Sequence, residues 1–486
     1  MTAPQQHIDD LVSATVAAGD RWAATEPAER RRILHAVADA LDAAADRLIP
    51  IALDESHLPQ ARLTSELTRT TFQIRLLADA AAAGEHLDVR IDHADPQWPM
   101  GAPRPDLRRT SVPLGPVLVF GASNFPFAFS TAGGDTASAL AAGCPVIYKT
   151  HPGHPELSEA TGAVVIDALD AAGAPAGLFA LVRSEADSRA VLAHPGIKAG
   201  AFTGGIPGGR ALFNIAQARP EPIPFYGELG SVNPVFVTAA AADSRAQEIA
   251  DGFLGSFTLG QGQFCTKPGI LLVPADSAIP ELLREAAIPA GHLLLHSGIA
   301  QAHSKVRDSL AGHAGVELLA GGGPEVDPPT PALLTTDSTT LIAGFDELVT
   351  ECFGPTALVV TYTDPADLLT IAGKLHGQLT ATLAAEPDDA IVGPLATVLT
   401  RKAGRILWNQ WPTGVSVTYA QQHGGPYPAS TTPGTTSVGT AALSRFVRAV
   451  AWQGFPQHLL PGELRDDQSI PAPRRVDGTL DPDTLR

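Results

Sequence analysis

The sequence predicts an α/β protein with mainly parallel sheets, divided into more than one domain. The chain has 486 residues, which allows about two to four domains of roughly 100–200 residues each. Short apolar runs alternate with helix-compatible segments from Pro113 to about Val237, and a second set of the same kind begins at Thr238. This alternation is typical of parallel, doubly wound sheets.

The first hundred residues indicate helices followed by a projecting arm. Ile33, Val37 and Leu41 share one apolar stripe at helical spacing, and a second helix is expected over residues 65–82. Residues 88–112 are polar, proline-rich and locally alternating, which predicts a hairpin arm.

Strands are expected where the apolar runs lie. In the first set these are Val117–Phe120, Pro145–Tyr148, Leu178–Val182, Gly200–Phe202 and Pro234–Val237. In the second set they are Ile270–Val273, Ala357–Val360 and Ala381–Ala384. Helices are expected at Leu157–Leu169, Ala211–Ala216, Ala246–Thr258, His303–Ala311 and Pro365–Lys374. The tail after Pro461 is charged and proline-rich, so no regular structure is expected there.

Composition excludes several classes of protein. The net charge is −18, which disfavours nucleic acid as a partner because phosphate contacts need a basic face. Cys144, Cys265 and Cys352 are the only cysteines, and their number and spacing predict neither a disulfide framework nor a metal site. Neither a secretory signal nor an apolar stretch of about 18 residues is present. We therefore expect a soluble, cytoplasmic protein without a membrane span.

A glycine-rich turn follows the apolar run that ends near Phe202. Its glycines are Gly204, Gly205, Gly208 and Gly209. Glycines between a strand and a helix let a phosphate approach the helix N-terminus. An ordinary tight turn explains the same residues, and a Rossmann interpretation would make Glu228 a ribose-binding acid.

Four further residues are candidates for chemistry, each with a structural alternative. Cys265 lies in the polar stretch GQGQFCT and is either a reactive thiol or a buried small hydrophobe. Asn124 follows an apolar strand and either donates to an anionic oxygen or caps a helix. Glu228 in ELGSVNP and Glu351 in ECFGP are either functional acids or turn residues.

Together these motifs resemble the aldehyde dehydrogenase superfamily over roughly residues 8–460. They follow in the family's order: Asn-Phe-Pro, Lys149, the glycine turn, and the motifs of Glu228, Cys265 and Glu351. The segments FYGELGSVNPVF, GQFCTKPG and HGGPYPAST are similar to the branch that contains 2,5-dioxopentanoate (α-ketoglutarate semialdehyde) dehydrogenases and NADP-dependent fatty aldehyde dehydrogenases. The resemblance implies a Rossmann-type cofactor domain, an α/β catalytic domain and a small β bridging unit.

The resemblance also assigns roles in an oxidation of an aldehyde to its acid. Cys265 would be the nucleophile that forms a thioester, with Asn124 and the Cys265 amide holding the oxyanion. Glu228 would deprotonate the hydrolytic water, and His423 would lie near the nucleophile. The implied substrate is 2,5-dioxopentanoate, which yields 2-oxoglutarate, or another aliphatic aldehyde or semialdehyde.

Cofactor residues carry over in the same way, and no metal is implied. Lys149 would reach the adenosine ribose, and Glu351 and Phe353 the nicotinamide ribose and ring. The turn with Gly204, Gly205 and Gly209 would lie against the pyrophosphate. Where NAD-preferring relatives commonly have a glutamate, this chain has Pro152, and Arg210 closes the turn. Since arginine matches phosphate geometry, NADP is expected to be preferred over NAD.

One residue departs from the pattern. Lys267 stands where an asparagine is expected, two residues after the nucleophile. It would either lower the thiol pKa or contact an acidic substrate, or be a solvated surface residue; the last is the expectation.

The domain boundaries expected from these motifs are residues 1–87 and 113–232 for the cofactor domain, 233–445 for the catalytic domain, and 88–112 with 446–486 for the bridging arm and tail. Bridging hairpins of the family pair with a neighbouring subunit, so a homodimer or homotetramer is expected. The alternatives are a CoA-acylating dehydrogenase, a cofactor-independent cysteine hydrolase that uses Cys265 and His423, and a catalytically silent binding protein.

Overall fold

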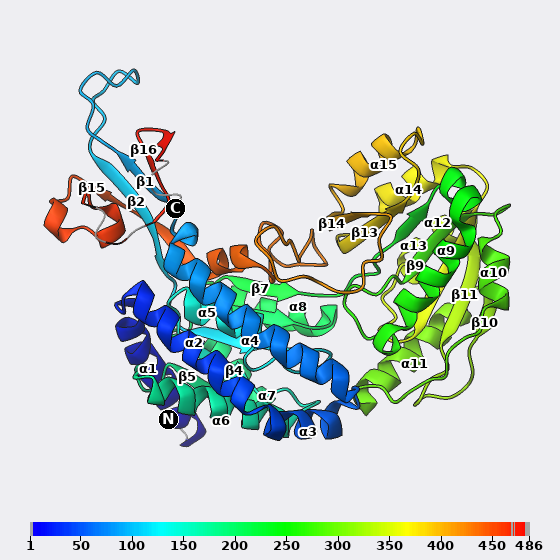
Figure 1. Cartoon of the computed structure of the whole chain (residues 1–486), viewed down its shortest axis with the longest axis horizontal. Helices are drawn as coiled ribbons and strands as arrows, with labels where there is room; N and C mark the ends of the chain where they lie inside the picture. Colours follow the sequence, from blue (N-terminus) through cyan, green and yellow to red (C-terminus); the bar gives the residue numbers. More distant parts are fainter. Residues whose placement is uncertain (1–2, 468–469, 471, 482–486) are drawn as a thin grey trace.

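Three β-sheets organise the chain, and each belongs to a different part of the molecule (Figure 1). The computed structural model describes residues 3–467, 470 and 472–481. A first α/β lobe lies in the middle of Figure 1, a second lobe lies at its right, and a β arm projects at the upper left. No helix in the described part of the chain is long and apolar enough to cross a membrane.

The first lobe begins with helices that cover its sheet. They are α1 (Ala3–Ala23), α2 (Pro27–Ala43), α3 (Ala45–Ser56) and α4 (Gln60–Ala83). Both expected helices are confirmed as parts of α2 and α4. Their apolar faces enter one core with the sheet, where Trp22, Leu41 and Tyr148 are fully buried. The indole of Trp22 also donates to the carbonyl of Leu140 at 2.8 Å.

The sheet of the first lobe is parallel, with the order β5-β4-β3-β6-β7. Its strands are β3 (Val117–Phe120), β4 (Val146–Lys149), β5 (Phe179–Val182), β6 (Ala199–Thr203) and β7 (Phe225–Glu228). Its helices are α5 (Gly134–Ala141), α6 (Pro155–Ala171), α7 (Glu185–Ala193) and α8 (Ile206–Gln217). The chain reverses direction across the sheet between β3 and β6. Ligands of open α/β sheets bind at the carboxyl ends of strands beside such a reversal.

Two expectations for this lobe were wrong. The run ending at Val237 is not the lobe's last strand but belongs to the second lobe, and Phe225–Glu228 takes its place. The sequence FYGE hides this strand because glycine and glutamate interrupt the apolar run. Helix α8 begins at Ile206 rather than after the glycines. Gly209 lies inside the first turns of α8. Glycine is needed there because a Cβ would lie 2.2 Å from Leu229 Cδ2.

The second lobe has a larger sheet with the order β10-β11-β12-β9-β8-β13-β14. Its strands are β8 (Val235–Val237), β9 (Ile270–Pro274), β10 (Glu317–Gly321), β11 (Ala332–Asp337), β12 (Thr356–Tyr362), β13 (Gln378–Ala384) and β14 (Ala403–Trp408). Only the edge pair β10–β11 is antiparallel. Apolar cores lie on both faces, which explains why β9, β12 and β13 read as continuous apolar runs.

Helices flank this second sheet. They are α9 (Ala239–Thr258), α10 (Ile279–Glu285), α11 (Ser297–Ala311), α12 (Ser338–Ala343), α13 (Phe345–Leu348), α14 (Ala366–Lys374) and α15 (Val392–Leu399). Short 3-10 helices lie at Glu85–Leu87, Leu259–Gly262, Thr440–Phe446, Gln457–Leu459 and Gly462–Leu464.

The arm joins segments from opposite ends of the chain. Its sheet has the order β15-β2-β1-β16-β17. The strands are β1 (Val89–Asp92), β2 (Leu107–Pro113), β15 (Val447–Gln453), β16 (Arg474–Val476) and β17 (Thr479–Leu480). The hairpin expected at residues 88–112 is confirmed by the antiparallel pairing of β1 and β2. The tail was wrongly expected to lack structure, because strands as short and polar as β16 show no periodicity.

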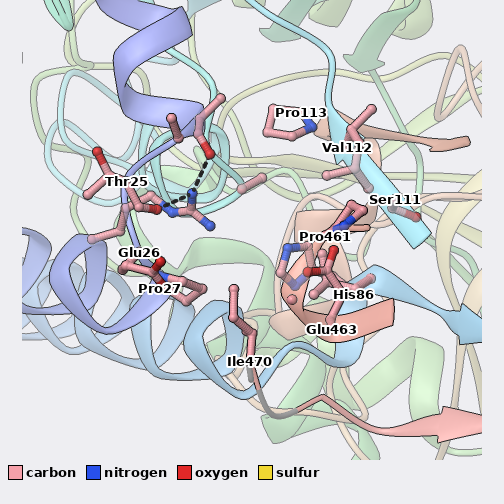
Figure 2. Close-up of a pocket in the computed structure, with 17 residues that line it drawn as sticks. Thr25, Glu26, Pro27, His86, Ser111, Val112, Pro113, Pro461, Glu463 and Ile470 are labelled. Atoms are coloured by element: carbon pink, nitrogen blue, oxygen red, sulfur yellow. Dashed lines mark hydrogen bonds between the residues drawn. The ribbon is translucent and has the colours of Figure 1, made fainter. Parts of the chain in front are cut away.

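A cavity of about 270 Å³ lies where the arm meets the first lobe. Figure 2 shows Thr25 and Pro27 on one side, and Pro461 and Glu463 across from them. His86 also lines it, and burial together with the nearby Arg30 charge lowers the pKa of His86 to about 4. Its wall holds neither a cysteine nor the glycine turn, so it is separate from the predicted chemistry.

One close backbone approach in the second lobe is testable. A Cβ on Gly404 of β14 would lie 2.0 Å from the Gly424 carbonyl oxygen, so Gly404→Ala must push two backbone segments apart. Overpacking of this kind costs about 1–3 kcal/mol, and we expect a lower melting temperature by calorimetry. Gly255→Ala in α9 is the matched control, because a Cβ there meets nothing within 4 Å. Equal melting temperatures for the two variants would contradict the close approach.

Candidate active site

A cleft of about 410 Å³ lies between the two lobes and collects most of the residues singled out in the sequence. From those residues, its lining takes Asn124, Gly204, Gly205, Glu228, Cys265, Glu351 and Phe353. Lys149, Gly209, Arg210 and His423 are not part of this lining. Segments far apart in the sequence thus converge where β3 and β6 of the first sheet end.

Cys265 follows a short segment with left-handed backbone, in which two of the three residues are glycine. Gly260, Gln261 and Gly262 have φ values of +56°, +57° and +64°, a left-handed region that ordinary residues avoid. A Cβ on Gly262 would also lie 2.2 Å from the carbonyl oxygen of Gly354. The glycines of GQGQFCT therefore shape the loop and bring it against the segment that follows Glu351.

Asn233 supports residues 260–267, the segment around Cys265 that we name the catalytic loop. Its Nδ2 donates to the carbonyl oxygens of Cys265 at 2.8 Å and Lys267 at 2.9 Å. Its Oδ1 accepts from the hydroxyls of Ser231 at 2.9 Å and Thr380 at 3.0 Å. Sequence reasoning missed this role, although an asparagine between ELGSV and an apolar run was a usable signal. The structure buries it completely, and its polar atoms are hydrogen-bonded.

Lys267 was expected at the surface, and that expectation was wrong. The side chain is buried, and its Nζ donates to the carbonyl oxygens of Cys352 at 2.5 Å, Gly354 at 3.0 Å and Thr356 at 2.7 Å. Burial lowers the pKa of Lys267, and the three carbonyl groups compensate for lost water. Lys267 thus ties the catalytic loop to the segment that carries Glu351.

The thiol faces a buried His–Glu pair. His423 Nε2 lies 3.5 Å from Cys265 Sγ and 2.8 Å from Glu228 Oε1. Ser437 Oγ donates to the other carboxylate oxygen of Glu228. A hydrolase triad uses one ring nitrogen for the nucleophile and the other for the acid. Here a single nitrogen meets both, and the buried Nδ1 has no partner, which disfavours the cysteine-hydrolase alternative.

The three groups also form a possible metal-ligand set. One ligand atom each from Glu228, Cys265 and His423 lies within 4.8 Å of the others. No ligand spacing in the sequence pointed to it, because the three residues come from distant segments.

Burial is the largest single influence on the pKa values of Cys265 and Glu228, but it decides the direction only for Cys265. Burial and the charges of Glu228 and Glu351 raise the pKa of the Cys265 thiol well above its ordinary value, against the opposing charge of Arg405. Burial alone would raise the pKa of Glu228 as well. The charge and hydrogen bond of His423, the Ser437 hydroxyl and the Arg445 charge outweigh burial and lower it. The resting site therefore combines a protonated thiol with an ionised carboxylate.

Asn124 does not cap a helix, because α5 begins only at Gly134. The side-chain Nδ2 of Asn124 donates to the backbone carbonyl oxygen of Gln263 at 3.0 Å. The backbone carbonyl oxygen of Asn124 accepts from Arg62 Nη2 at 2.8 Å. An amide nitrogen carries two hydrogens. One is used to join the Asn124 loop to the catalytic loop, and the second remains for a ligand in the cleft.

The far part of the cleft suits a dinucleotide. Gly204 and Gly205 precede the N-terminus of α8, and a Cβ on Gly205 would come no nearer than 3.9 Å to its surroundings, which leaves space for a phosphate. Glu351 projects into the cleft close to Gly230, where a Cβ would meet its Oε2 at 2.5 Å. Burial raises the pKa of Glu351 to about 7.

Two predicted cofactor residues, Lys149 and Arg210, lie outside the lining of the cleft, and their contacts with a cofactor stay predictions. Lys149 ends β4 and is half-buried. Arg210 is exposed and lies over the rings of Phe213 and Tyr427, at 5.2 and 5.8 Å from their centres. Sequence reasoning missed two histidines that line the cleft beside Pro152, His151 and His296. Their rings lie 6.2 Å apart, and burial lowers both pKa values.

Comparison with known proteins agrees with this arrangement. Residues 1–448 match the Aldehyde dehydrogenase family. The chain is 40% identical to the alpha-ketoglutaric semialdehyde dehydrogenase of Acinetobacter baylyi and 43% identical to alpha-ketoglutaric semialdehyde dehydrogenase 2 of Azospirillum brasilense. Each alignment covers 98% of this chain and 92% of the relative.

Solved structures share the fold. The NADP-dependent glyceraldehyde-3-phosphate dehydrogenase of Bacillus halodurans, complexed with NADP, matches with a TM-score of 0.76 and 22% identity over 92% of this chain and 91% of that one. The 1-pyrroline-5-carboxylate dehydrogenase from Thermus, with bound NAD, matches with a TM-score of 0.74 and 19% identity over 92% and 86%. This chain therefore belongs to the aldehyde dehydrogenase family and is an oxidoreductase that acts on aldehydes.

Proposed function

We propose that this protein oxidises 2,5-dioxopentanoate to 2-oxoglutarate with a nicotinamide dinucleotide, through a thioester on Cys265. The observation that carries the proposal is the meeting of Cys265, Asn124 and Glu228 in one cleft between the lobes. The substrate is inferred from the relatives at 40% and 43% identity, both of which are alpha-ketoglutaric semialdehyde dehydrogenases. Another aliphatic aldehyde or semialdehyde is the second candidate within the same chemistry.

Activation of the nucleophile is the first step. The raised pKa of Cys265 keeps it a thiol at rest, so a base must take its proton before attack. The Glu228–His423 pair lies against the sulfur, and the lowered pKa of Glu228 keeps that carboxylate ionised. The thiolate then adds to the aldehyde carbon.

Stabilisation of the oxyanion and release of the acid follow. The free N–H of Asn124 and the Cys265 amide donate to the oxyanion, and losing one such donor typically costs about 10²–10³ in rate. The bound dinucleotide supplies the acceptor for the hydride. Once the proton taken from the thiol has passed to solvent, Glu228 is again a carboxylate and deprotonates the water that cleaves the thioester. That water-activating role favours hydrolysis over transfer to CoA, and acyl-CoA as the main product in the presence of CoA would contradict it.

Replacement of the nucleophile tests this mechanism. Cys265→Ala removes the sulfur, so aldehyde oxidation followed by NADPH absorbance should disappear, while dinucleotide binding measured by fluorescence persists. Cys144→Ala is the matched control, because Cys144 is fully buried in the core of the first lobe. It should keep its turnover. Oxidation by the Cys265→Ala variant at the wild-type rate would overturn the assignment.

NADP is proposed as the preferred cofactor. No carboxylate stands at Pro152 to repel a 2′-phosphate, and His151 and His296 flank that position. Arg210, which the sequence suggested for this contact, is exposed and lies over two aromatic rings instead. Arg210 stays a predicted cofactor contact, and the two imidazoles are proposed as further phosphate ligands.

The cofactor proposal predicts a selective loss. His296→Ala should lower kcat/KM for NADP about tenfold, the value of a hydrogen bond to a charged group, and leave kcat/KM for NAD nearly unchanged. His7→Ala, at an exposed position, serves as control. A wild-type enzyme that prefers NAD by tenfold or more, or equal losses with both cofactors, would contradict the proposal.

The arm is proposed to form a dimer. Strand β15 is the outer strand of its sheet, so one side of it is open, and open edges readily pair with another chain. The bonds from Gly454 N to Asp106 O and from Leu114 N to Phe446 O mark the even-numbered residues as those facing β2. The amides of Ala449 and Ala451 consequently face outward.

A reducing compartment also fits the proposed function, because all three cysteines are free.

This pairing can be tested at one amide. Ala451→Pro removes an outward N–H while leaving the bonds to β2, so light scattering after gel filtration should show a smaller assembly than wild type. Ala451→Val keeps the N–H and should preserve the assembly. A monomeric wild type, or an Ala451→Pro protein with wild-type mass, would refute pairing through β15.

A further inference from the structure

One face of helix α4 supports the loop that carries Asn124. Arg62, Glu66, Arg69 and Gln73 recur at helical spacing and therefore lie on one side of the helix. Arg62 Nη2 donates to the Asn124 carbonyl at 2.8 Å. Glu66 accepts from the amides of residues 127 and 128 at 2.9 and 3.0 Å, and Gln73 donates to the carbonyl of residue 128 at 3.3 Å. Three of these four side chains are thus committed to the loop.

Arg69 is the exception in this row. Its Nη1 is buried without a hydrogen-bond partner, and its Nη2 makes only a 3.4 Å contact with the Val415 carbonyl. Burial lowers the pKa of Arg69, against the favourable charges of Glu66, Cys265 and Glu228. A guanidinium withdrawn from water with an unused N–H is costly, so a purely structural role accounts poorly for it.

The position of Arg69 relates it to the nucleophile. Its guanidinium lies 5.2 Å from the centre of the Phe129 ring, which lies 6.1 Å from the ring of His423. His423 contacts Cys265 Sγ. Neither Arg69 nor Phe129 belongs to the lining of the dinucleotide cleft, so Arg69 is linked to His423 through Phe129 rather than through that lining.

A second arginine approaches the same region from β14. Arg405 donates to the carbonyls of Pro412 at 2.7 Å and Gly414 at 3.1 Å, and its buried Nε has no partner. Gly414 N in turn donates to Thr266 Oγ1 at 3.2 Å, directly after the nucleophile. Residues 412–415 therefore join both arginines to the catalytic loop.

We propose that Arg69, assisted by the charge of Arg405, binds the carboxylate of the substrate and selects aldehydes that carry an acid group a few bonds from the reacting carbon. The inference rests on the proposed function, because it places the aldehyde carbon at Cys265. A guanidinium pairs with a carboxylate through two parallel N–H bonds, and Phe125 and Phe129 around Arg69 reduce competition from water. Lys267 cannot serve this purpose, since three carbonyls already hold it.

The test compares an acidic aldehyde with a neutral one of equal length. Wild-type enzyme should have a higher kcat/KM for succinic semialdehyde than for butanal. Arg69→Gln should raise KM for succinic semialdehyde about tenfold or more, as expected for a lost charged pair, and change the constants for butanal by less than about twofold. Arg69→Lys keeps the charge but not the planar fork, so it should recover part of the preference.

Controls separate this inference from a structural effect and from the proposed function itself. Arg75→Gln lies on the same helix, where Arg75 pairs with Asp39 and Asp42 at the surface, and should behave like wild type. Equal losses of both aldehydes in Arg69→Gln, or no loss of either, would overturn carboxylate binding. A wild-type enzyme that oxidises butanal as well as succinic semialdehyde would also overturn it. A wild type that oxidises neither would instead contradict the proposed function.

Discussion

The hydrogen bonds of one buried amide underlie the whole active site. Asn233 binds the carbonyls of Cys265 and Lys267 with one end and the hydroxyls of Ser231 and Thr380 with the other. It precedes β8, in the interior of the second sheet. The position of Cys265, the proposed nucleophile, is therefore set by hydrogen bonds that lead to the second sheet, and support of this kind holds a site close to its productive geometry.

Lys267 extends the same principle in the opposite direction. Its ammonium group donates to three carbonyls of residues 352–356, so the catalytic loop is tied directly to the segment with Glu351. Buried cations are tolerated only when hydrogen bonds replace the lost water. The result is that the thiol and the proposed ribose-binding acid keep a fixed separation across the cleft.

The ordering of motifs allowed much of the site to be predicted. Asn124 and the glycine turn follow strands β3 and β6, and parallel strand ends meet at one edge, so their proximity was accessible from the sequence. The fate of Lys267 was not, because a charged side chain looks the same in sequence whether water or carbonyls surround it. The His151–His296 pair was not accessible for the same reason, since its orientation depends on tertiary neighbours, and the contact of Arg210 with the cofactor stays a prediction.

Strands were missed in the sequence where the local pattern of apolar residues does not reveal the strand with which a segment pairs. Phe225–Glu228 contains a glycine and an acid and is nevertheless a largely buried strand. Its last residue, Glu228, lines the cleft. Residues 474–476 pair with β17 nearby and with the parallel edge of β1, which is far away in the sequence. Short-range periodicity carries no information about such pairings.

The arm has a consequence for the order of events during synthesis. Strand β1 hydrogen-bonds on one side to β2 and on the other to β16, which the ribosome adds some hundreds of residues later. Both α/β lobes can acquire their cores before that segment emerges, whereas the arm must wait for it. The completed arm, and with it the proposed pairing through its open edge, therefore has to await the synthesis of residues 447–476.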